Sequence, residues 1–428
     1  MENLKKISGI FFAAFLFFLP ISTILIIEEK FIGSFKFQYG SFGIYGAEIL
    51  LWIALMLFFI ANFKYIADIL KKPNLNKSLK RFFFISLLVL IFISGVSIFW
   101  SIDKRMAFYA FFRILEGGAI FSFLLLNYRK RYLWILFYSG LFQAIFVIAQ
   151  FFMQISYANK YLGTVGHLPY EAGALVLHGS GRWLRAYGLV NDPNLLGGFM
   201  LFAIIISIYL YIKSKNKFES TLSVSGTVIF ATALFFSFSR SALIGLIVAL
   251  TFVFIGIFVK NKTALKKFLT PAIISLVVLG ILTTIYFPII AGRIFVDNRL
   301  ESHSLNERYV FNNQAISIIK NKWLYGTGIG NYTFNLLERE PDLKPWQYQP
   351  THNIYLLIFA ELGIIAITSF IVLSFFAIKI GIKNKNFIFL GLFIGFMFIG
   401  LWDHYFWTTW QGISMWWISL ALLLAIDI

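Results

Sequence analysis

Long runs of apolar residues, separated by short polar segments, occupy most of this chain. The runs are about 16–25 residues long, close to the roughly 20 residues with which a helix crosses the hydrocarbon core of a bilayer. This pattern predicts an all-α polytopic membrane protein, a single membrane domain over residues 1–428 with about twelve transmembrane helices. The predicted helices cover residues 9–27, 44–62, 82–100, 107–126, 133–153, 195–212, 220–238, 241–259, 269–290, 353–378, 387–402 and 413–427.

Composition and charge agree with this pattern and predict its orientation. Hydrophobic residues make up 59% of the chain and charged residues 13%, whereas about a quarter of residues are charged in an ordinary soluble domain. With the N-terminus inside, the cytoplasmic segments hold 21 Lys and Arg residues and the short outer loops hold 5. Because basic residues collect in cytoplasmic loops, both termini are predicted to be cytoplasmic. The net charge of +18 therefore orients the helices, and no nucleic-acid partner is expected.

Two predicted outer segments are too long to be simple turns: residues 154–194, and residues 291–352 between predicted helices nine and ten. Long ordered loops usually carry function, and we expect the second to form a catalytic subdomain. It contains a helical pattern over residues 306–320, followed by the glycine-rich sequence YGTGIGNY, which predicts a tight turn. Its aromatic residues either stack on sugars or pack the subdomain: Trp323, Tyr325, Tyr332, Trp346 and Tyr348.

Polar residues at the predicted outer ends of the helices stand out from the apolar remainder. Arg182 and Arg185 precede predicted helix six, and they would share a face if this stretch were helical. Arg240 lies at the turn before predicted helix eight, and Arg308 lies in the helical part of the long loop. His352 ends that loop, at the outer mouth of predicted helix ten. These five residues are the main candidates for chemistry.

Arginines beside a histidine at a membrane surface suit one class of reaction. A guanidinium group is permanently charged and presents a fork of donors to phosphate oxygens, so several of them can hold a pyrophosphate. A neutral histidine can take a proton near pH 7. Together they suit attack by a hydroxyl on a sugar whose leaving group is a lipid-linked pyrophosphate. Taken singly, each arginine could instead reach to lipid headgroups, and the histidine could simply bond to a loop.

The other polar residues divide into structural candidates and candidates for substrate contact. Arg113 and Glu116 are expected to form a buried pair, and Glu361 is expected to face away from His352. The segment 403–412 either forms the floor of a sugar site or belongs to an aromatic belt. No metal and no cofactor is expected, because the chain has no Cys and no cluster of ligands at metal-binding spacing. Candidates for sugar or acceptor contacts are Asn191, Asn194, Asn353, Tyr355, Asp403 and His404.

Four short motifs, in order along the chain, resemble the O-antigen ligase and O-antigen polymerase superfamily of bacterial envelope glycosyltransferases. They are RAYGLVNDPN at 185–194, SRSA at 239–242, WLYGTGIGNY at 323–332 and THNIYL at 351–356. The resemblance runs roughly from predicted helix five to the C-terminus and includes the order and spacing of the loops.

The resemblance implies a membrane glycosyltransferase of the C-type fold (GT-C-like) that uses neither a metal nor a nucleotide sugar. Such enzymes move a glycan from undecaprenyl pyrophosphate to an acceptor on the outer face of the bacterial inner membrane, with inversion at the anomeric carbon. By position in the motifs, Arg185 and Arg240 would hold the donor pyrophosphate, and His352 would be the base. Arg182 and Arg308 are secondary candidates for the pyrophosphate site.

Three functions remain open at this stage. We prefer a ligase, which passes the glycan to lipid A core or another cell-surface acceptor, because one large outer loop ends in His352 before predicted helix ten. A polymerase of the same superfamily would use a second lipid-linked glycan as the acceptor. A transporter or flippase for a lipid-linked glycan would fit twelve helices, but few ionisable residues lie near the predicted bilayer midplane. In each case the expected partners are the lipid-linked glycan and membrane lipids.

Overall fold

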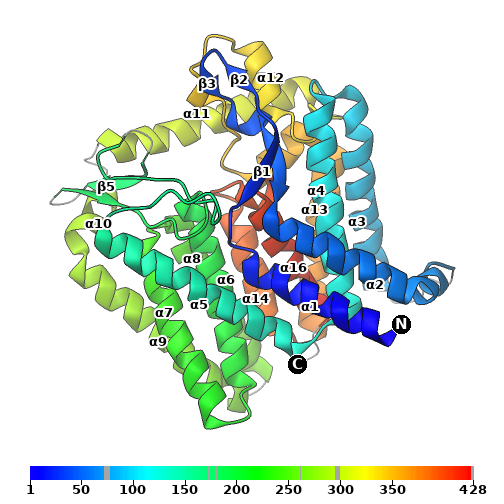
Figure 1. Ribbon diagram of the computed structural model, residues 1–428, viewed down its shortest axis with the longest axis vertical. Helices are drawn as coiled ribbons and strands as arrows, with labels where there is room; N and C mark the ends of the chain where they lie inside the picture. The colour runs from blue at the N-terminus through cyan, green and yellow to red at the C-terminus, as the bar shows by residue number, and fades with distance from the viewer. Residues whose placement is uncertain (72–77, 172–173, 179–180, 261, 295–298, 426–428) are drawn as a thin grey trace.

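The computed structural model describes residues 1–71, 78–171, 174–178, 181–260, 262–294 and 299–425. Its helices are α1 (Glu2–Phe18), α2 (Gly46–Lys71), α3 (Ser78–Val96), α4 (Lys104–Asn127), α5 (Lys130–Met153), α6 (Pro193–Ile212), α7 (Lys217–Phe236), α8 (Arg240–Lys260), α9 (Lys262–Ile285), α10 (Phe287–Ile294), α11 (Arg299–Lys322), α12 (Tyr332–Arg339), α13 (Ile354–Lys383), α14 (Phe387–Ile399), α15 (Tyr405–Thr408) and α16 (Trp410–Ala425). The strands are β1 (Ile24–Glu28), β2 (Phe31–Ile32), β3 (Phe35–Lys36), β4 (Phe42–Tyr45), β5 (Val176–His178) and β6 (Arg182–Leu184), and the 3-10 turns are η1 (Gln38–Gly40), η2 (Ser97–Trp100) and η3 (Pro345–Gln347). The strands, α11 and α12 lie toward one end of the helical bundle, whereas α1 begins toward the other (Figure 1).

Each of the twelve predicted segments contains a helix. In the part of the chain that the structure describes, nine helices are long and apolar enough to cross a bilayer, namely α2 to α9 and α13. The other three are shorter: α1 has 17 residues, α14 has 13 and α16 has 16. The chain therefore has the fold of a polytopic helical membrane protein, and the count of twelve spans stays a prediction.

The first predicted helix, residues 9–27, extends too far toward the C-terminus. Helix α1 ends at Phe18, and strand β1 follows and pairs antiparallel with β4. Leu25 and Ile27 of this strand are exposed. A continuous apolar run does not distinguish a strand from a helix, and the pairing with β4 decides it. The pair is held against α4, where Tyr109 and Arg113 donate to the carbonyl of Gly43, and it carries the hairpin β2–β3 at its tip (Figure 1).

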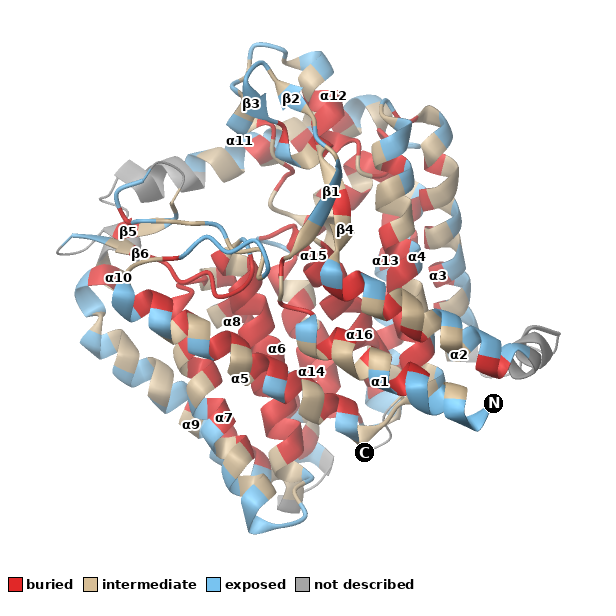
Figure 2. Ribbon diagram, viewed as in Figure 1, coloured by how far each residue is buried: buried red, intermediate tan, exposed pale blue. Residues whose placement is uncertain are grey.

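Helix α6 lies at the centre of the bundle, and its side chains are buried on nearly every face (Figure 2). It contacts α5, α7, α8, α9 and α14. The carboxylate of Asp192 caps it by accepting the backbone amides of Asn194 at 2.6 Å and Leu195 at 3.1 Å, and Pro193 is its first residue. Aspartate as the cap and proline in the first position both favour a helix start. The loops that meet this end of α6 are thus held against a rigid element.

Helix α13 is broken in its N-terminal third. Gly363 has φ 74° and ψ −171°, a conformation that is in practice open to glycine alone. The glycine-rich turn packs into the break, where the amide of Thr327 donates to the carbonyl of Ala360 at 3.0 Å. The amide of Gly328 donates to the carbonyl of Glu361 at 2.8 Å. Three glycines of this segment have a positive φ, which confirms the predicted tight turn.

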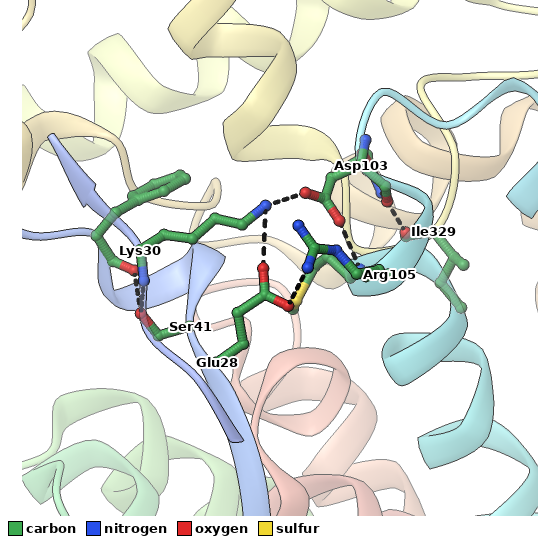
Figure 3. A network of polar contacts seen from close by, with 9 residues as sticks. Glu28, Lys30, Ser41, Asp103, Arg105 and Ile329 are labelled. Carbon is green, nitrogen blue, oxygen red and sulfur yellow. Dashed lines mark hydrogen bonds and ion pairs between the residues drawn. The ribbon is translucent and has the colours of Figure 1, made fainter. Parts of the chain in front are cut away.

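A network of polar contacts ties the N-terminal strands to the start of α4 and to the long loop (Figure 3). The ammonium group of Lys30 contacts the carboxylates of Glu28 and Asp103. Arg105 lies 3.2 Å from Glu28. The backbone amide of Asp103 donates to the side chain of Asn331 at 2.7 Å, and the side chain of Asn331 donates back to the carbonyl of Asp103 at 3.1 Å. Three segments that are distant in sequence are therefore fixed together at this end of the bundle.

The predicted buried pair in the fourth transmembrane helix is confirmed. Arg113 lies 2.7 Å from Glu116, and Glu48 of α2 joins the pair at 2.6 Å. All three side chains are buried. Removing either partner of such a buried pair is strongly destabilising, because the remaining charge is left uncompensated. We therefore assign this triad to the structure of the bundle.

Candidate functional site

A histidine and a carboxylate from two distant loops meet near the start of α6. His352 ends the loop before α13, and Asp403 and His404 lie between α14 and α15. The Nδ1 atom of His352 is 3.7 Å from Oδ1 of Asp403, and the ring centroids of His352 and His404 are 4.9 Å apart. Phe311 of α11 stacks on His352 with its centroid at 6.0 Å. We call His352, Asp403 and His404 the histidine cluster.

The members of the histidine cluster are buried to different depths. Asp403 and His404 are buried, whereas the side chain of His352 is 21% exposed. Nδ1 of His404 lies 2.7 Å from the hydroxyl of Thr408. Among the described residues, Nδ1 of His352 and Oδ2 of Asp403 have no hydrogen-bond partner. Buried polar atoms are nearly always paired in folded proteins, so these two atoms make the histidine cluster a candidate for binding a ligand.

Electrostatic effects give the members of the cluster different charge states. Burial alone would raise the pKa of Asp403, but the two histidines and Arg308 outweigh it and hold the pKa below its ordinary value. Burial, with the charges of His352 and Arg308, lowers the pKa of His404 from 6.5 to about 3 against the opposing charge of Asp403. At neutral pH, Asp403 is therefore ionised and His404 is neutral. The charge of Arg308, on α11, contributes to lowering the pKa of both Asp403 and His404.

Arg185 is fixed at the start of α6. Its Nε atom donates to the carbonyl of Ser237 at 2.8 Å, and Nη2 donates to Oδ1 of Asn194 at 2.7 Å. Burial raises the pKa of the neighbouring Asp192, and the charge of Asp403 raises it further, while Arg185 partly opposes them. The two carboxylates are thus close enough to interact. Through them, Arg185 and Asn194 belong to the same site as the histidine cluster.

Arg240 lies beside this arginine in the fold. It is the half-buried first residue of α8. The starts of α6 and α8 pack directly together, because a Cβ atom added to Gly197 would overlap the side chain of Ser239. Each helix N-terminus carries a partial positive charge. Arg240 therefore lies at a helix end that favours an anion, whereas at the start of α6 the carboxylate of Asp192 already takes this place.

Arg182 does not join this arrangement. It is exposed in strand β6 and lines a separate groove with Tyr170 and Trp183. The stretch from Arg182 to Arg185 would have placed both side chains on one face as a helix, but it forms a strand and its exit. The antiparallel pairing of β6 with β5 holds this stretch in an extended conformation. As a result, Arg182 is exposed while Arg185 is buried.

Two predicted contact residues have structural partners. The side chain of Asn353 caps α13 by accepting the amides of Tyr355 at 2.9 Å and Leu356 at 3.1 Å. The hydroxyl of Tyr355 donates to the carbonyl of Met397 on α14 at 2.8 Å. Asn191 is exposed, directly before the cap of α6. Asn353 and Tyr355 thus hold His352 in place by anchoring the helix that follows it.

Sequence reasoning missed three residues of the site. Asp192 stands before a proline and an apolar run, a pattern that identifies a helix cap but not a neighbour of Asp403. The hydroxyl of Tyr405 is buried, lies against Gly198 of α6, and has no hydrogen-bond partner among the described residues. The ring of Tyr39 lies 6.0 Å from that of His404. Both tyrosines reach the site only through tertiary packing.

The lowered pKa of His404 predicts an acid-sensitive fold. Between its value of 6.5 in the unfolded chain and about 3 in the folded protein, the unfolded state binds more protons, so stability rises with pH across this range. We expect the melting temperature in detergent to fall as the pH is lowered from 6.5 toward 4, and to fall less in His404→Gln. Thermal unfolding of both proteins across this range tests the prediction, and the same pH dependence in both would contradict it.

Part of the chain matches a known protein family. Residues 225–371 match the family model described as O-antigen ligase. The matched segment runs from α7 through the long loop into α13, and it includes Arg240, Arg308 and His352. No curated protein gives a significant match. Three of the four motifs lie inside the matched segment, at 239–242, 323–332 and 351–356, and the match supports the resemblance to this family.

Proposed function

We propose, from the match of residues 225–371 to the O-antigen ligase family, that the chain moves a glycan from undecaprenyl pyrophosphate to an acceptor hydroxyl. The acceptor oxygen attacks the anomeric carbon, and the bond to the pyrophosphate oxygen breaks with inversion. The reaction lies at the outer face of the bacterial inner membrane, with both termini in the cytoplasm. One observation carries the proposal: His352 faces the ionised Asp403, Arg308 lies close enough to lower the pKa of Asp403, and Arg185 opposes the raised pKa of the neighbouring Asp192.

His352 is the proposed general base. Its Nδ1 atom faces Asp403 at 3.7 Å, so Nε2 is the nitrogen that takes the proton of the acceptor hydroxyl. An ionised carboxylate beside the imidazole stabilises the positive charge that forms when the proton arrives. His404 is too weak a base for this role, because its pKa is about 3. Its neutral ring keeps a second positive charge away from His352.

Arg185, Arg240 and Arg308 are the proposed pyrophosphate residues. As the glycosidic bond breaks, its electron pair stays with the pyrophosphate, and fixed positive groups lower the energy of this transition state. Arg185 suits the role because its bonds to Ser237 and Asn194 hold it in place before the donor binds. The N-terminal end of α8, which Arg240 begins, adds to the positive potential. Guanidinium groups can thus supply the charge stabilisation that a metal ion supplies in other phosphate sites.

The acceptor separates the two enzyme functions that the same site could perform. In the ligase, which we prefer, the hydroxyl belongs to lipid A core or another cell-surface acceptor. In the polymerase it belongs to a second lipid-linked glycan. The chemistry at His352 is the same in both.

Transfer by the purified protein in liposomes tests the proposal. With undecaprenyl-pyrophosphate-linked glycan and a panel of acceptors, we expect a glycosylated acceptor and free undecaprenyl pyrophosphate, at the same rate with a chelator present. Arg240→Ala is expected to lower the rate by about 10²–10³-fold. Arg339→Ala, in the outer helix α12 where its guanidinium bonds to Ser317, is the control and should retain the rate.

Two results would contradict the proposal. Movement of the intact lipid-linked glycan across the bilayer, without release of undecaprenyl pyrophosphate, would identify a transporter. Loss of activity with the chelator, restored by a divalent cation, would show that the arginines do not suffice. The acceptor that receives the glycan decides between ligase and polymerase.

A further inference from the structure

A cleft of about 170 Å³ opens between the N-terminal hairpin and the turn η3 of the long loop. The residues of this cleft that matter here are Phe35, Gln38, Tyr39, Trp346, Tyr348 and Gln349. Phe35 and Trp346 are 54% and 55% exposed, and their rings meet edge to face at 5.9 Å. We call it the aromatic cleft.

The composition of the aromatic cleft suits a saccharide. Aromatic side chains present apolar faces to the C–H faces of a sugar ring, and tyrosine adds a polar tip. The amide side chains of Gln38 and Gln349 offer both donors and acceptors, which match hydroxyl groups. The amide of Gln349 also donates to the carbonyl of Trp346 at 2.9 Å, which steadies the turn. An apolar wall with a few placed polar groups is the usual composition of a small-molecule site.

The aromatic cleft leads to the histidine cluster. Tyr39 lines the cleft and also a smaller inner pocket, of about 60 Å³, together with Pro350, Trp407 and Thr408. The ring of Tyr39 lies 6.0 Å from the ring of His404. The ring of His404 in turn lies 4.9 Å from that of His352. A saccharide in the cleft would therefore have one end near the proposed base.

The cleft and Arg185 belong to different parts of the fold. The hairpin β2–β3 that forms one wall of the cleft and the strand β6 that precedes Arg185 lie at separate edges of the fold (Figure 1). In a displacement with inversion, the attacking oxygen and the leaving group lie on opposite sides of the reacting carbon. If the arginines hold the leaving pyrophosphate, the acceptor comes from the side of the cleft.

We propose that the aromatic cleft binds the sugar residues of the acceptor and guides its hydroxyl to His352. This inference rests on the proposed function for the identity of the two substrates. Binding of a saccharide to the cleft does not itself depend on the transfer reaction. The two can therefore be tested separately.

The first experiment measures saccharide binding without chemistry. The probes are oligosaccharides graded by length, released by mild acid from the envelope glycans of the source cells, so that they carry neither lipid nor pyrophosphate. Binding to the full chain in nanodiscs is followed by saturation-transfer NMR. We expect Trp346→Ala to weaken binding by about tenfold or more, and Trp346→Phe to retain most of it. His352→Ala should bind as the wild type does.

Trp323→Ala is the matched control. Trp323 is also 55% exposed and belongs to the same long loop, but it lies at the end of α11, away from the cleft residues. It should bind the oligosaccharides as the wild type does. Equal weakening in the Trp323 and Trp346 variants, or no weakening in either, would overturn the assignment of the cleft. Elution of each variant as a single folded species excludes misfolding as the cause.

The second experiment assigns the saccharide to one substrate. In the transfer assay, Trp346→Ala is expected to raise KM for the acceptor, with kcat and the KM for the donor unchanged. A rise in the KM for the donor alone would overturn the acceptor assignment. If the wild-type protein does not transfer the glycan, the proposed reaction fails. If Trp346→Ala nevertheless loses oligosaccharide binding, the saccharide site stands.

Discussion

Substitution of His352 by alanine is expected to lower the rate of glycan transfer by about 10²–10⁴-fold, the usual contribution of a positioned general base. The donor should still bind, because the proposed pyrophosphate residues lie outside the loop end that carries His352: Arg185 in the segment between β6 and α6, Arg240 on α8 and Arg308 on α11. The loss should therefore fall on kcat rather than on the KM for the donor. Initial rates at several donor concentrations, with equal amounts of folded protein, measure both constants.

A second substitution tests the role of the carboxylate. Asp403→Asn keeps the shape of the side chain but removes the charge that faces Nδ1 of His352 at 3.7 Å. It should also lower kcat. His167→Ala is the control, because His167 is a half-buried outer histidine that stacks on Tyr187 at 4.5 Å, outside the histidine cluster. Full activity in His352→Ala would contradict the proposed mechanism. If only His404→Ala were inactive, His404 would be the general base.

Substitution of Gly363 by alanine is expected to abolish most of the folded protein. The φ of 74° and ψ of −171° at this position exclude a side chain without strain, and a Cβ atom would overlap the backbone of Leu324. Strain and overlap together should cost on the order of 3 kcal/mol or more. Thermal stability of the protein in detergent, read by size-exclusion chromatography after heating, measures the loss.

Gly280→Ala provides the comparison for this prediction. Gly280 lies within α9, and nothing lies within 4 Å of the position that a Cβ atom would take. Alanine is the better helix former by about 1 kcal/mol, so this variant should match or exceed the wild type in stability. If the two variants were equally stable, the break in α13 would not be the rigid feature that the hydrogen bonds indicate.

The helical part of the fold could be predicted because lipid imposes one length and one composition on every span. All twelve apolar runs contain a helix, and the helical stretch of the long loop is also present as α11. The prediction was wrong at Ile24–Glu28, where the apolar run forms strand β1 and does not continue the first helix. There the pairing with β4, a contact between segments distant in sequence, decides the structure.

The site could be predicted one residue at a time but not as an arrangement. His352, Arg185 and Arg308 stand out as polar residues in an apolar chain, and each lies at or beside the histidine cluster. The facing of His352 and Asp403 could not be predicted, because packing of α13 against α14 sets it. Arg182 shows the reverse case, since its spacing from Arg185 suggested a shared face that the strand β6 removes.

The break in α13 also limits how the long loop can move during turnover. The carbonyls of Ala360 and Glu361 receive their hydrogen bonds from Thr327 and Gly328 of the loop. Lifting this segment would leave two buried carbonyls without donors, at about 1–3 kcal/mol each. The segment is therefore a poor candidate for a lid that opens in every cycle. In the proposed reaction, donor and product would pass other parts of the surface, while the helix that follows His352 stays bonded to this loop.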